Sequence, residues 1–106
     1  SPSLEEEKVA DFIVFDENIP VCAGYMYVTN SKVGWCDWVV SNFEYKDRKK
    51  RKKALSLLVE VFSHTLKLCG CNYGYALLKS DSLIEVYENN GYIKADKYNA
   101  EMMKLL

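Results

Sequence analysis

The stretch from Val39 to Gly70 constrains the fold of this chain more than any other. It passes from a hydrophobic segment through a short polar loop into six consecutive cations, which are followed at once by a run with helical periodicity. The pattern predicts a long helix with one buried face, capped by Asp47 and ended by Gly70. The apolar positions of that face are Leu55, Leu58, Val59, Phe62, Leu66 and Cys69.

The place of the cations is unusual, because a helix N-terminus already carries unpaired N–H groups and a partial positive charge. Free N–H groups, the helix dipole and flanking Lys and Arg side chains together describe a site for phosphate groups. The sequence therefore predicts a site for a multiply phosphorylated ligand, the alternative being a solvated charged face above a buried stripe. The cations concerned are Arg48, Lys49, Lys50, Arg51, Lys52 and Lys53.

Composition predicts one folded domain over residues 1–106, with 49% hydrophobic and 27% charged residues. The formal net charge of -1 conceals segregation, because residues 46–53 hold seven of the 14 Lys and Arg residues. The chain is therefore not a polycation that coats nucleic acid, but it has one local positive patch.

Hydropathy and cysteine spacing restrict the compartment and the metal chemistry. No apolar run approaches the roughly 20 residues that cross a bilayer, and no secretion leader is visible, so we expect a cytoplasmic protein without a membrane partner. Cys22, Cys36, Cys69 and Cys71 have no second Cys or His pair at zinc spacing. We expect free thiols and no metal.

Hydrophobic periodicity predicts the remaining elements. A short helix at 83–88 follows an N-cap cluster at 80–82, and residues 3–7 are expected to form a helical turn or a frayed end. Strands are expected at 10–15, 21–29, 34–40, 72–78, 92–95 and 98–106. The order β-β-β-α-β-α-β-β predicts an α/β class fold (α+β, mixed sheet), with a parallel crossover through the long helix.

This order resembles the GNAT-type N-acetyltransferase superfamily over residues 10 to 100. The likeness is carried by the strand Trp35 to Val40 with its following helix start, by the strand Tyr75 to Leu78, and by the segment LIEVYENNGY at 83–92. The last is similar to the family's short helix with a Tyr-Glu-Lys-x-Gly-Phe-like ending. The resemblance implies that acetyl-coenzyme A lies between two splayed parallel strands, with its pyrophosphate on the N–H groups that open the long helix.

The sequence departs from the family pattern in two places. The family's helix start usually reads Arg/Gln-x-x-Gly-x-Gly/Ala, and alignment on Ala54 puts Asp47, Lys50 and Lys52 there. Without glycines, cationic side chains would replace close backbone contact with the pyrophosphate. Little precedes Ala10, so the family's N-terminal part is expected to be reduced, missing or supplied by another subunit.

The resemblance assigns chemical roles to particular positions. A backbone N–H near Val39 or Val40 would polarise the thioester carbonyl. Tyr87 matches the tyrosine that protonates the leaving thiolate, the alternative being a tyrosine that covers the sheet.

Two further roles are open. Asp37 or Glu44 would be the general base, although an outward, solvated Asp37 is the plainer interpretation. Ser80 would contact the pantetheine arm, although a simple N-cap is the stronger interpretation. His64 is interpreted as structural.

Two functions follow from these patterns. The first is direct transfer of an acetyl group from acetyl-coenzyme A to a small-molecule or protein amine. The second is a catalytically inactive GNAT-like module that binds phosphate or nucleic acid through the basic helix start. Nucleic acid is disfavoured because aromatic residues are not interleaved with the cations. A homo-oligomer is expected, because an open sheet edge and an unwalled cleft are surfaces that a partner could cover.

Overall fold

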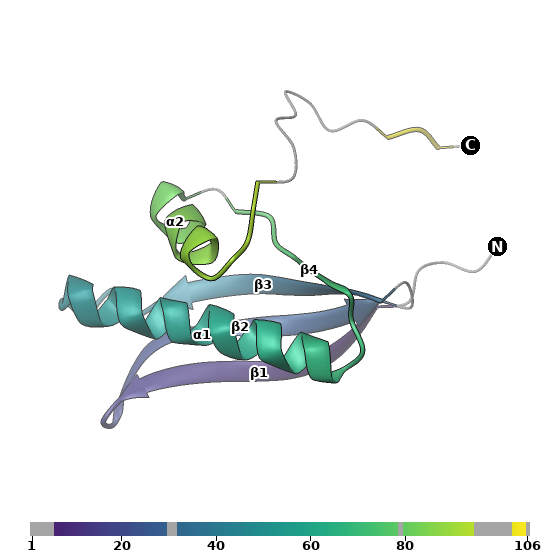
Figure 1. Ribbon diagram of the computed structural model, residues 1–106. Helices are drawn as coiled ribbons and strands as arrows, with labels where there is room; N and C mark the ends of the chain where they lie inside the picture. Colours follow the sequence, from purple (N-terminus) through teal and green to yellow (C-terminus); the bar gives the residue numbers. More distant parts are fainter. Residues whose placement is uncertain (1–5, 30–31, 79, 95–102, 106) are drawn as a thin grey trace.

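A computed structural model describes residues 6–29, 32–78, 80–94 and 103–105. The described residues include a four-stranded mixed sheet with strand order β1-β2-β3-β4. Strand β4 is parallel to β3, and the other neighbouring strands are antiparallel. Figure 1 shows both helices on the same side of this sheet. In chain order the elements are β1 (Glu6–Asp16), β2 (Ile19–Thr29), β3 (Val33–Ser41), α1 (Arg48–Leu68), β4 (Tyr73–Tyr75) and α2 (Asp81–Asn89).

Helix α1 begins and ends where the sequence predicts. The side chain of Asp47 accepts a hydrogen bond from the backbone N–H of Lys50 at 3.1 Å. Gly70 adopts φ 85°, the left-handed conformation in which glycine ends helices without steric cost. The residue between helix and glycine, Cys69, is exposed, so its expected place in the buried stripe is wrong.

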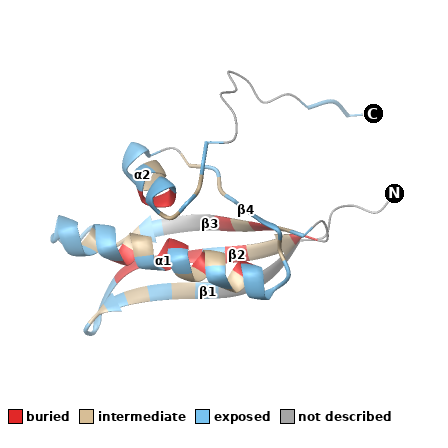
Figure 2. Cartoon of the chain, viewed as in Figure 1, coloured by how far each residue is buried: buried red, intermediate tan, exposed pale blue. Residues whose placement is uncertain are grey.

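The core lies between α1 and the sheet. Leu58, Val59 and Phe62 are fully buried on α1, and Met26 is fully buried on β2. The rings of Phe12 and Phe62 meet edge to face with centroids 5.5 Å apart. Figure 2 shows buried residues on the side of α1 that faces the strands. The amphipathic stripe therefore fixes the helix along the sheet.

Two neighbouring glycines let other side chains press onto the sheet. Gly34 of β3 pairs with Gly74 of β4. A Cβ on Gly34 would lie 2.2 Å from a methyl group of Leu66, and a Cβ on Gly74 would lie 2.7 Å from the hydroxyl of Tyr92. The side of the β3–β4 ladder toward α1 is thus closed by Leu66 and Tyr92.

Several predicted elements need correction. The strand expected at 72–78 is only Tyr73–Tyr75, and Glu6 and Glu7 extend β1 rather than forming a helical turn, because they pair with β2. Residues 92–94 form no strand, since the N–H of Tyr92 closes the end of α2 on the carbonyl of Tyr87. Residues 103–105 form no strand either, and 1–5, 95–102 and 106 lie outside the described residues.

Candidate functional site

Strands β3 and β4 part after a short ladder. Their pairing ends at Trp35 with Tyr75, whereas β3 continues to Ser41 along β2. Residues 76–78 have no regular structure. In the described part of the chain, β3 beyond Trp35 therefore has a strand partner on one side alone. The predicted carbonyl-polarising positions, Val39 and Val40, lie in this stretch of β3.

The cations that open α1 divide into engaged and unengaged side chains. Lys52 forms an ion pair with Glu85 of α2 at 2.7 Å, and Lys50 lies 3.8 Å from Asp16 of β1. The guanidinium group of Arg51 donates a hydrogen bond to the backbone carbonyl of Tyr45. Among the described residues, Arg48, Lys49 and Lys53 form no ion pair. The protein thus neutralises part of the patch with its own groups.

The N–H groups at the tip of α1 are also only partly used. The carboxylate of Asp47 takes the N–H of Lys50, and the carbonyl of Asp47 takes the N–H of Arg51 at 2.9 Å. Neither Arg48 nor Lys49 donates its backbone N–H to another described residue. Two backbone donors and the side-chain charges of Arg48, Lys49 and Lys53 therefore remain at the helix start.

Tyr45 and Asp16 complete this end of the molecule, and sequence analysis missed both. The buried Tyr45 donates its hydroxyl to Oδ2 of Asp16 at 2.7 Å. That hydrogen bond is the main reason that the pKa of Tyr45 is raised to about 12. The two residues lie far apart in the sequence, so no local signal could have found the pair.

Tyr87 lies inside the protein on the α1 side of the sheet. It is 2% exposed, and its ring meets that of Tyr92 edge to face at 5.0 Å. Burial raises the pKa of Cys36 on β3 to about 11, and interactions with the hydroxyls of Tyr92 and Tyr87 partly offset this rise. Tyr92 also lies 2.8 Å from the hydroxyl of Ser63. The predicted acid is thus part of a buried polar cluster.

The other predicted site residues are placed less decisively. The side chain of Asp37, like that of Val39, lies outside those described. Glu44 is exposed in the loop before α1. Ser80 is the N-cap of α2 and accepts from the N–H of Leu83 at 3.4 Å. His64 is exposed on α1. The described side chains contain no group of three or more potential metal ligands.

A cavity of about 340 Å³ lies at the opposite end of α1 from the cations. Its lining includes Lys67, Asn72, Tyr73 and the linked hydroxyls of Ser63 and Tyr92. It belongs to the C-terminal end of the helix, so it is not part of the candidate phosphate site.

Neither helix in the described part of the chain combines the length and the hydropathy needed to cross a membrane.

Comparison with known proteins supports the fold. No family model and no curated protein matches the chain. Among solved structures, a putative acetyltransferase from Agrobacterium tumefaciens superposes with a TM-score of 0.55 at 14% sequence identity. The match covers 89% of this chain and 67% of that one. At this identity the likeness concerns the fold alone.

Proposed function

We propose that this chain is an N-acetyltransferase domain that transfers an acetyl group from acetyl-coenzyme A to an amine. One observation carries the proposal: β3 leaves β4 at Trp35 and runs on into the loop that delivers the cationic start of α1. Parted parallel strands beside a helix N-terminus offer a slot for an extended arm and a cradle for its phosphates. The likeness in fold to a protein named as an acetyltransferase agrees with this.

The residues at the helix start fit a diphosphate. The diphosphate would meet the backbone N–H groups of Arg48 and Lys49. It would also meet the side chains of Arg48, Lys49 and Lys53, which form no ion pair with a described residue. Charge-assisted hydrogen bonds of this kind are the stronger ones. Asp47 occupies one N–H of the tip, so side chains would carry more of the binding than in a glycine-lined site.

The chemistry needs two groups from this chain. When bound, acetyl-coenzyme A supplies the thioester; the C–N bond to the amine forms as the C–S bond breaks. A backbone N–H near Val39 or Val40 would stabilise the oxygen of the reacting carbonyl. Tyr87 would give its hydroxyl proton to the departing sulfur, and the amine would release one proton to water or a base such as Asp37.

Burial of Tyr87 sets a condition on this mechanism. Its hydroxyl oxygen has almost no exposed surface. Helix α2 is held to α1 by the Lys52–Glu85 ion pair and by a 3.0 Å hydrogen bond from Asn90 to Ser56. We therefore expect α2 to move outward when the thioester arm enters, with Ser80 at its N-terminus moving along.

The test is the melting temperature with and without acetyl-coenzyme A. A ligand that binds only the folded state raises it by mass action. The double variant Arg48→Gln, Lys49→Gln should lose most of the increase. Lys67→Gln is the matched control, because it removes a cation from the same helix about 27 Å from Lys49. No increase at millimolar ligand, or equal loss in the control, would count against the proposal.

A binding module without catalysis is the second candidate, and the buried hydroxyl of Tyr87 favours it. In that case the cations of α1 would meet phosphates of a nucleic acid in a sequence-independent and steeply salt-dependent way. Titration with duplex and single-stranded oligonucleotides at two salt concentrations separates the candidates. Binding that ignores salt, or no binding at low salt, removes this alternative.

A further inference from the structure

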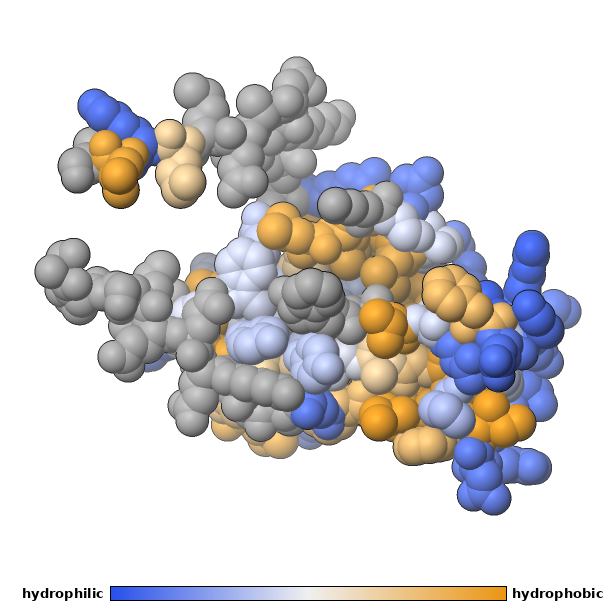
Figure 3. All heavy atoms as spheres, turned by 180° about the vertical axis from the view of Figure 1, so that it is seen from behind, coloured by the Kyte–Doolittle hydropathy of each residue, from blue (hydrophilic) through white to orange (hydrophobic). Residues whose placement is uncertain are grey.

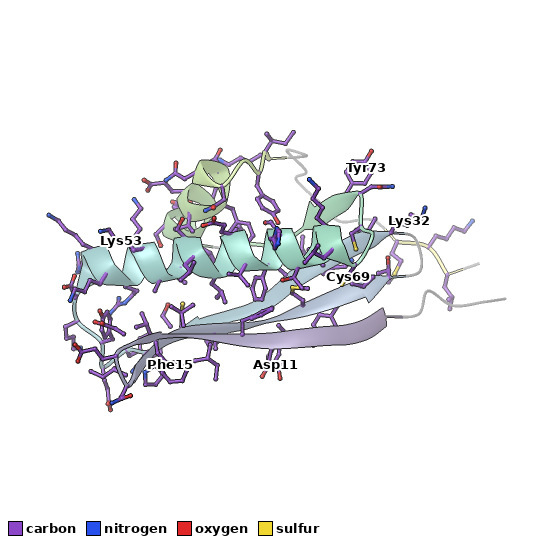
Figure 4. All side chains as sticks on the ribbon, turned by 60° about the horizontal axis from the view of Figure 1, so that its bottom comes forward. Asp11, Phe15, Lys32, Lys53, Cys69 and Tyr73 are labelled. Carbon is purple, nitrogen blue, oxygen red and sulfur yellow. The ribbon has the colours of Figure 1, made fainter. Side chains whose placement is uncertain are left out.

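The end of the molecule at which α1 begins carries exposed apolar side chains as well as cations. Phe43, in the loop before α1, is 87% exposed, and Phe15 and Ile19, on either side of the β1–β2 turn, are 55% and 51% exposed. Figure 4 shows Phe15 and Lys53 at this same end, one on the sheet and one on α1. Figure 3 shows apolar surface here beside charged side chains. We call Phe15, Ile19 and Phe43 the apolar tip.

Hydrogen bonds hold the loop before α1 against the β1–β2 hairpin. Asn42 donates its backbone N–H to the carbonyl of Val21 and its side-chain amide to the carbonyl of Pro20, both at 2.8 Å. The side-chain oxygen of Asn42 also accepts the N–H of Glu44 at 3.0 Å, so Phe43 is the central residue of an Asx turn. Phe43 thus lies beside the first residues of β2, with bonded neighbours on both sides and its own ring in solvent. The apolar tip is therefore one surface built by two segments.

Cations outnumber the free carboxylates around the apolar tip. Three carboxylates are engaged by the protein itself, because they accept a hydroxyl of the loop, cap α1 or pair with a cation of α1; these are Asp16, Asp47 and Glu85. The exposed Glu17 on the turn and Glu44 in the loop form no ion pair with a described residue. The cations without an ion pair in the described part of the chain include Lys46, Arg48, Lys49 and Lys53. The field around the tip is therefore positive, with Lys46 in the same loop as Phe43, and it complements an anionic surface.

We propose that the apolar tip and Lys46 dock this chain reversibly on a membrane surface that contains anionic lipids. The side chains of the tip enter the boundary between headgroups and acyl chains, and the cations beside them meet the anionic headgroups. A bilayer fits this surface because the tip consists of a turn and a loop that project at one end of the sheet, as Figure 1 shows. The expected absence of a membrane partner concerns apolar runs long enough to cross a bilayer, and docking of this kind needs none.

Co-sedimentation of the full chain with vesicles tests the proposal. We expect binding to vesicles of phosphatidylcholine with about one third phosphatidylserine, much weaker binding to phosphatidylcholine alone, and a decline with salt. Phe43→Ser should weaken binding roughly tenfold or more, and Lys46→Gln about fivefold. Leu68→Ser and Lys67→Gln are the matched controls, because they make the same kinds of change at the other end of α1, about 30 Å away. Leu68 is 74% exposed, so neither serine variant disturbs the core.

Each outcome decides for or against docking through the apolar tip. The proposal is wrong if the mixed vesicles do not bind at low salt, or if Phe43→Ser binds them as tightly as the parent. Binding of single-stranded oligonucleotide without binding of vesicles would assign the cations to nucleic acid instead. The melting-temperature increase with acetyl-coenzyme A should be the same in Phe43→Ser and Lys46→Gln as in the parent, since neither residue is a proposed donor to the diphosphate. Failure of vesicle binding and failure of the proposed function are therefore separate results.

Discussion

Gly34 is the position at which a single methyl group should disturb the fold most directly. A Cβ there would lie 2.2 Å from Cδ2 of Leu66 and 2.9 Å from its Cδ1 and Cγ. Leu66 is 2% exposed, so its methyl groups must shift against neighbouring core groups or into the cavity that it also lines. Overpacking of this kind typically costs about 1–3 kcal/mol. Replacing glycine also restricts the unfolded chain, which returns roughly 0.4–1 kcal/mol. We therefore expect Gly34→Ala to lower the free energy of unfolding by about 1–2 kcal/mol.

A double-mutant cycle identifies Leu66 as the cause. Leu66→Ala alone should cost about 2–5 kcal/mol through the lost side chain and the cavity. In the Leu66→Ala background the added methyl group of Gly34→Ala enters the vacated space, so its cost should vanish or change sign. Urea unfolding followed by far-ultraviolet circular dichroism gives all four free energies. If the two costs simply add within about 0.5 kcal/mol, the steric explanation fails.

Three further changes test other parts of the structure. Burial raises the pKa of Cys36 from 9.0 to about 11, so the folded state keeps the thiol protonated in a range where the unfolded chain ionises it. The free energy of unfolding is therefore unaffected below about pH 9 and falls by about 2–3 kcal/mol as the pH rises to 11. Cys36→Ala should abolish this part of the fall, measured by urea unfolding at pH 8 and 11. Asp47→Ala should lower stability by about 1 kcal/mol through the lost N-cap, yet enlarge the melting-temperature increase with acetyl-coenzyme A. Glu85→Gln should cost less than about 1 kcal/mol, and less again in high salt, because both side chains of its ion pair are more than half exposed.

Local patterns were enough to predict β1 to β3, α1 and α2. The hairpin strands show alternation and turn residues, and the caps Asp47 and Ser80 lie where their side-chain oxygens accept helix N–H groups. The parallel pairing of β4 with β3 follows from the chirality and length of the crossover. The strands, helices and caps are encoded by neighbouring residues, and the pairing of β3 with β4 needs only the one crossover between them.

Long-range contacts decided the rest. Residues 76–78 are apolar and read as a strand, yet β4 ends at Tyr75, and sequence pattern carries no sign of where a ladder stops. Tyr92 reads as the start of a strand because tyrosine and isoleucine favour strands, but its hydroxyl is held by Ser63 of α1. The same limit applies to the candidate site, where Asp16 and Glu85 reach the cations from other elements.

Helical phase divides the cationic run in a way that the linear sequence does not. Successive residues of a helix are turned by about 100°, so Arg48 has the same phase as the buried Leu66, which packs on the sheet. Lys49 lies within about 20° of Ser56, whose hydroxyl contacts Asn90 of α2. Arg48 is therefore on the side of α1 toward the sheet, and Lys49 is on the side toward α2. Arg48→Gln should therefore reduce the melting-temperature increase with acetyl-coenzyme A more than Lys49→Gln, although both remove one charge from the same turn. Equal effects would mean that the patch acts only as a diffuse field, and the phosphate site at the helix start would lose its geometric basis.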